Sequence, residues 1–165
     1  MSSSTDNTTS GSNAPVQFID EFFPLVVCVS PTRYDDVELQ RMYDGYRRYF
    51  ERGKRYALVT HTREGAEPAS PRARKAIVDW ANRPEVRANS AKLCVGSSTV
   101  VANALARGAM TAMLWLWKPA SPHHLAATID EAIDWSIDQL VAAGVALPQP
   151  REKLRAAVLA KLRRI

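Results

Sequence analysis

The sequence LCVGSSTVV, residues 93–101, is an apolar run that meets a glycine and then three hydroxyl residues. We interpret residues 93–95 as a core β-strand, with Gly96, Ser97 and Ser98 at its end. A helix is then expected from Thr99 to about Trp117. A strand that passes directly into a helix is the repeating unit of an α/β fold.

Segments of the same two kinds lie on both sides of this junction. Apolar runs typical of strands cover residues 16–19, 25–30, 56–61 and 123–127, and the first two could form a hairpin. Helical patterns cover residues 35–52, 70–83, a short stretch before Lys92, and 128–144. The alternation predicts an α/β domain with a single mostly parallel or mixed sheet of about four to five strands and about four packed helices.

Several helix ends carry local signals. Gly53 suits the C-terminal cap of the first helix, and Gly144 ends the last helix of the domain. Ser70 followed by Pro71 is a typical helix start, and Thr128 with Glu131 matches a capping box.

The predicted helix 99–117 is apolar almost all round, which indicates burial on more than one side. Asn103 and Arg107 interrupt it, so we do not expect it to span a membrane. Trp115 and Trp117 near its end either pack in the core or form a surface for a partner or a second copy of the chain.

The two ends of the chain differ from the domain between them. Residues 1–15 are almost entirely Ser, Thr, Asn and Gly, which predicts a disordered tail, and the domain is expected over residues 16–145. Residues 146–165 form a linker and a basic helix, which carries six basic side chains and one acidic one, whereas residues 1–150 are neutral overall.

This basic helix places apolar and basic residues together. We expect it to dock on an acidic protein partner or back onto its own domain. Nucleic-acid binding through it is an alternative, although it lacks the interleaved aromatic residues. The residues assigned to partner binding here are Leu154, Arg155, Val158, Lys161 and Leu162.

Two segments resemble a known family. The strand PLVVCVS, residues 24–30, and the final helix IDEAIDWSIDQL, residues 129–140, resemble the STAS and SEC14-like group of anti-sigma-factor antagonists. The resemblance implies a non-enzymatic regulatory module, often controlled by phosphorylation of a serine at a helix N-terminus. The helix in that position starts at Ser70 here. No residue pattern indicates the lipid-carrier role suggested for some SEC14-like relatives.

The serines after Gly96 do not fit two known glycine-containing motifs. A nucleophile elbow requires a second glycine, and a phosphate loop requires a second glycine and a lysine, none of which is present. Ser98 is therefore expected to cap a helix, with Ser70, Ser97 and Ser98 as candidate phosphorylation or anion-binding residues. A serine hydrolase or transferase that pairs Ser97 or Ser98 with His61 is the enzymatic alternative.

No metal or cofactor is expected. His123 and His124 are adjacent and would point to opposite faces of a strand, so they could not share one ion. Cys28 and Cys94 lie in apolar runs, which favours a reducing compartment, and no export signal is visible, so we expect a cytoplasmic location. The sequence thus favours a non-enzymatic module that binds a protein partner and forms a homo-oligomer.

Overall fold

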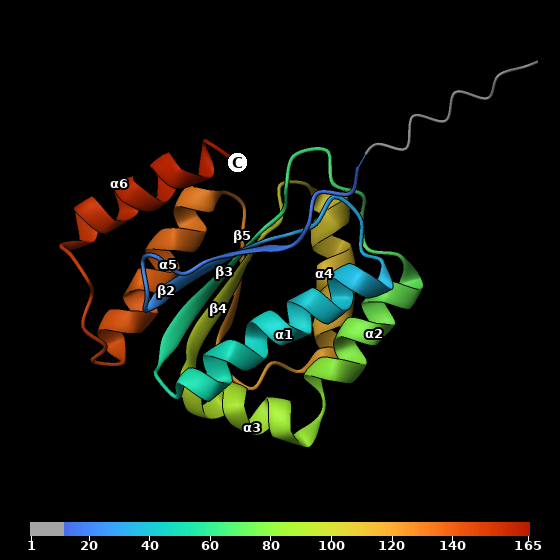
Figure 1. Ribbon diagram of the computed structural model, residues 1–165, viewed down its shortest axis with the longest axis horizontal. Coiled ribbons are helices and arrows are strands. Elements are labelled where there is room, and N and C mark those ends of the chain that lie inside the picture. Colours follow the sequence, from blue (N-terminus) through green and yellow to red (C-terminus); the bar gives the residue numbers. More distant parts are fainter. Residues whose placement is uncertain (1–11) are drawn as a thin grey trace, which may run out of the picture.

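A computed structural model describes residues 12–165 and contains, within that range, one five-stranded mixed sheet. The strands follow the chain order from one edge of the sheet to the other (Figure 1). β1 pairs antiparallel with β2, and the other neighbours are parallel. The strands are β1 (Gln17–Ile19), β2 (Leu25–Val29), β3 (Tyr56–His61), β4 (Cys94–Val100) and β5 (His123–Ala126). The predicted α/β class and mixed sheet are confirmed.

Helices cover both faces of this sheet (Figure 1). One face carries α1 (Asp36–Arg52), α2 (Pro71–Ala81), α3 (Pro84–Leu93) and α4 (Ala104–Trp117). The opposite face carries α5 (Ile129–Ala142) and α6 (Arg151–Leu162). The two sides of the sheet therefore face different sets of helices.

The helix signals in the sequence act as expected. The Ser70 side chain accepts a hydrogen bond from the backbone N–H of Ala73 at 3.1 Å, and Gly53 adopts the left-handed conformation with φ of 62°. Thr128 accepts from the N–H of Glu131 at 3.2 Å. The Glu131 carboxylate, however, accepts from the N–H of Ala127, one residue before the position that a capping box uses.

The prediction of a strand over residues 93–95 and a helix from Thr99 is wrong, because β4 continues through Ser97 and Ser98 to Val100. Thr99 and Val100 are β-branched and favour a strand, and the following helix starts later, at an N-cap formed by Asn103. Gly96 is needed for packing, since a Cβ there would lie 2.7 Å from Cγ of Gln139 and 3.0 Å from the ring of Trp135.

The expectation that the apolar helix is buried on more than one side is also wrong. α4 lies wholly within the described residues and contains no buried residue. One side faces the sheet across a cavity and the other faces solvent. An apolar composition by itself does not show whether a helix is buried on both sides or, like α4, faces a cavity on one side and solvent on the other.

The N-terminal segment meets the domain earlier than the predicted boundary at Val16. Asn13 and the backbone N–H of Arg33 are hydrogen-bonded, and Ala14 and Thr32 exchange two further hydrogen bonds. Residues 13–15 therefore do not belong to a disordered tail. Residues 1–11 of the predicted tail lie outside the described residues.

Candidate functional site

Ser97 and Ser98 lie inside β4, and they point to opposite faces of the sheet. The fully buried Ser98 donates to the carbonyl oxygen of Ala132 at 3.2 Å and is hydrogen-bonded to Ser136 at 3.0 Å. Its hydroxyl therefore joins β4 to α5. The predicted role of Ser98 as a helix cap is wrong, because Asn103 caps the helix that follows.

The structure does not bring His61 together with either serine. His61 ends β3 on the α5 side of the sheet, and no hydrogen bond within residues 12–165 joins it to Ser97 or Ser98. Its Nδ1 is buried and has no partner among the described residues. Burial and the charge of Arg63 lower the pKa of His61. The enzymatic alternative therefore lacks its predicted contact.

Ser97 instead contacts a residue that the sequence did not connect with it. Its Oγ lies 2.7 Å from Nδ1 of His123, and the neighbouring β5 places the two residues in direct register. The other ring nitrogen, Nε2, lies 3.5 Å from Oγ1 of Thr99. Burial lowers the pKa of His123 to about 4, with a smaller contribution from His124. The imidazole is therefore neutral at physiological pH.

This pair lies on the wall of a cavity of about 420 Å³ between the sheet and α4. The strand residues that line the cavity include Tyr56, Leu58, Cys94 and Val100 together with the polar side chains of Thr60, Ser97, Thr99 and His123. We call these four polar residues the polar floor. Thr60 and Thr99 are partners in the β3–β4 register, so the floor runs across three adjacent strands.

The opposite side of the cavity is apolar. α4 contributes Ala106, Met110, Met113 and Trp117, spaced so that they share one face of the helix. We call this face the α4 roof. The edge of the Trp117 ring contacts His123, with ring centres 5.3 Å apart. Methionine side chains adapt to irregular shapes, which suits a wall that contacts a bound molecule.

Aromatic residues of α1 and α2 close the side of the cavity. Tyr43 stacks on Trp80 with ring centres 4.7 Å apart, and Tyr46 contacts the same ring at 5.4 Å. Burial raises the pKa of Tyr46 well above its ordinary value, so its hydroxyl stays neutral. Tyr46 itself lines the cavity, together with Trp80.

The two tryptophans, predicted either to pack in the core or to form a partner surface, lie on different sides of α4. Residues two positions apart point in different directions on a helix, so Trp117 joins the cavity whereas Trp115 is 78% exposed. Leu105 and Leu116 are also exposed, at 86% and 71%. The outer side of α4 is thus an apolar surface in contact with solvent.

The basic C-terminal helix docks on its own domain. Leu154 and Val158 are fully buried, and Leu159 and Leu162 pack partly against the same core. The expectation that Leu154 and Val158 meet a separate partner is not met here. Of the two alternatives in the sequence, docking back onto the domain is the one observed.

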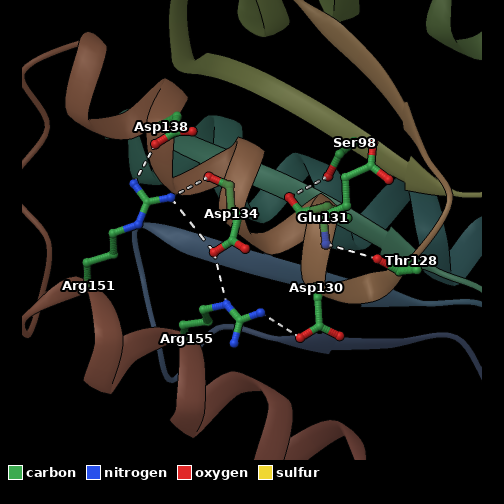
Figure 2. A network of polar contacts seen from close by, with 9 residues as sticks. Ser98, Thr128, Asp130, Glu131, Asp134, Asp138, Arg151 and Arg155 are labelled. Carbon is green, nitrogen blue, oxygen red and sulfur yellow. Dashed lines mark hydrogen bonds and ion pairs between the residues drawn. The ribbon is translucent and has the colours of Figure 1, made fainter.

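An acidic row on α5 receives the basic residues of α6 (Figure 2). Arg155 contacts Asp130 at 2.6 Å and Asp134 at 3.0 Å, and Arg151 pairs with Asp138. Lys161 pairs with Glu21 at 2.8 Å. The acidic surface expected on a partner is therefore present within the same chain.

The described part of the chain contains neither a candidate metal site nor a candidate membrane-spanning helix. No group of three or more His, Cys, Asp or Glu side chains is placed to hold a metal ion in residues 12–165. None of the described helices combines the length and apolarity needed to cross a membrane. The cavity beneath α4 is the feature among the described residues that we consider as a binding site.

Comparisons with known proteins give no relative. No family model, no curated protein and no solved structure matches this chain. The functional proposal therefore rests on the cavity and the residues that line it.

Proposed function

We propose that this protein is a non-enzymatic binding module for a small, mainly apolar molecule, held between the polar floor and the α4 roof. The observation that supports this most directly is the cavity of about 420 Å³, which has an apolar helix on one side and a few polar groups on the other. Pockets for small ligands typically have this size and composition.

Binding accounts for the Ser97–His123 contact better than catalysis does. A catalytic serine needs a histidine that can accept its proton, and a pKa of about 4 makes His123 a weak base. Thr99 is the group next to the other ring nitrogen, where a triad would place a carboxylate. These features favour a role in ligand recognition.

We also propose a regulatory role and a cellular location for this protein. The resemblance of residues 24–30 and 129–140 to STAS and SEC14-like domains leads us to propose a regulatory role as well. Cys28 and Cys94 are both buried free thiols, which supports a reducing, cytoplasmic location.

A second candidate function is supported by the outer side of α4. Leu105, Trp115 and Leu116 expose large apolar side chains on the helix that also forms the roof. Apolar surfaces of this kind favour protein contacts, including contacts with a second copy of the chain. A ligand beneath α4 could then influence a partner above it.

The binding proposal is tested with the neutral fluorescent probe prodan and the full-length protein. Ala106 lines the cavity, whereas Ala112, on the same helix, is exposed and outside it. Ala106→Phe should fill the cavity and weaken prodan binding roughly tenfold or more, equivalent to about 1.4 kcal/mol. Ala112→Phe is the matched control and should bind like the wild type.

Either of two results would contradict the proposal. One is that prodan does not bind the wild-type protein, measured by fluorescence titration. The other is that Ala106→Phe and Ala112→Phe bind prodan equally well while circular dichroism shows both to be folded.

A further inference from the structure

The polar floor can exchange hydrogen bonds without carrying charge. Thr60, Ser97 and Thr99 contribute hydroxyl groups, each able to donate and to accept. In the neutral ring of His123, one nitrogen donates and the other accepts, whichever tautomer is present. Nε2 makes only a long 3.5 Å contact with Oγ1 of Thr99, whereas Nδ1 is 2.7 Å from Ser97, so Nε2 is the ring nitrogen that a ligand oxygen can engage.

The charged residues of the cavity lining come from its helices and loops and not from the sheet. They are Glu67, Arg74 and Arg87. Arg74 donates to the carbonyl oxygen of Ala69 at 3.0 Å, and Arg87 donates to that of Lys118 at 2.7 Å. Both guanidinium groups thus donate to backbone carbonyls away from the floor, and the floor itself contains no cation to pair with a carboxylate.

We propose that the ligand is a neutral amphiphile, whose hydroxyl or carbonyl oxygen bonds to Ser97, Thr99 and His123 while its hydrocarbon part packs on the α4 roof. This inference rests on the proposed binding function. A carboxylate placed on the floor would lose its hydration without gaining a counter-ion, which is strongly unfavourable. An alcohol or ketone loses much less on transfer and regains hydrogen bonds.

The test compares two displacing ligands of equal chain length, decanol and decanoate, which differ in charge at neutral pH. Each is titrated against full-length protein loaded with prodan. Decanol should displace the probe at a concentration at least roughly tenfold lower than decanoate does, because only decanoate buries a charge.

Variants then locate the recognition on the floor. Ser97→Ala combined with Thr99→Val removes two hydroxyl groups with little change of shape, and should weaken decanol binding roughly three- to tenfold. Thr111→Val is the matched control, since Thr111 lies on the exposed side of α4 and bonds only to the Arg107 carbonyl. Its decanol affinity should equal that of the wild type.

The outcomes separate the two proposals. If prodan does not bind at all, the binding function itself fails. If prodan binds but decanoate displaces it as readily as decanol, and Arg74→Gln or Arg87→Gln abolishes that effect, the ligand is anionic and the present inference is wrong. Unchanged decanol affinity in the folded double variant would also overturn it.

Discussion

The two faces of the sheet are built in opposite ways. On the α5 side, strands, α5 and α6 form a continuous core in which Ile133, Ile137, Leu140 and Leu154 are fully buried. On the other side, α4 has no buried residue and covers a cavity. Beneath α1, α2 and α3 this second face also has buried clusters, around Tyr49, Met42 and Trp80. The contrast is therefore between the continuous core under α5 and α6 and the open region beneath α4, where the same kind of substitution should have different effects.

The largest effect is expected from removing α6. Deleting residues 150–165 exposes the apolar surface that Leu154 and Val158 cover, and should lower the free energy of unfolding by about 3–6 kcal/mol. Urea denaturation followed by circular dichroism measures this change. Deleting only the exposed residues 163–165 is the control, and equal stability of the two deletions would show that α6 is not part of the domain core.

Acidification should destabilise the protein through His123 on the cavity side. Because its folded-state pKa of about 4 lies below the ordinary 6.5, the unfolded chain binds a proton first as the pH falls. The free energy of unfolding should therefore be lowest below pH 4 and rise by about 3 kcal/mol up to pH 6.5, at 1.36 kcal/mol per pKa unit.

The lowered pKa of His61 changes stability in the same direction, so variants are needed to isolate the contribution of His123. His123→Gln should flatten most of the pH dependence between 4 and 6.5, whereas His124→Gln, on the next residue, should retain it. Identical pH profiles for the two variants would mean that His123 is not held in its neutral form.

A pair of glycine substitutions compares a packed position on the α5 side of the sheet with an exposed position on α4. Gly96→Ala, on the α5 side, meets Gln139 and Trp135 and should cost about 1–2 kcal/mol. Gly108→Ala, within α4, has nothing within 4 Å of its added Cβ and should stabilise by about 0.5–1 kcal/mol, because alanine is the better helix former. Thermal unfolding gives both values, and effects of the same sign would contradict the contrast between the packed Gly96 and the exposed Gly108.

The smallest effect on stability is expected at the outer side of α4. Trp115→Gln replaces an exposed ring and should change the free energy of unfolding by less than about 0.5 kcal/mol. It should leave prodan binding unchanged and reduce any self-association seen by sedimentation velocity. A large loss of stability would place Trp115 in the core instead of on a surface.

The amino-acid sequence determined most element boundaries through local interactions. Ser70 and Gly53 define helix ends because capping involves only groups a few residues apart. The apolar run YALVTH forms β3 over the predicted residues 56–61, because a short apolar run is by itself a signal of a buried strand.

The candidate site was decided only by tertiary structure. Ser97 and His123 are adjacent because β4 and β5 pair in parallel register, a contact between residues 26 positions apart that no local pattern encodes. LCVGSSTVV remains a strand past its glycine because residues 97–100 pair with the neighbouring strands β3 and β5. In the same way, α4 lies above a cavity although its composition resembles that of a core helix. Local capping follows from neighbouring residues, whereas cavities and cross-strand pairs depend on how distant elements pack.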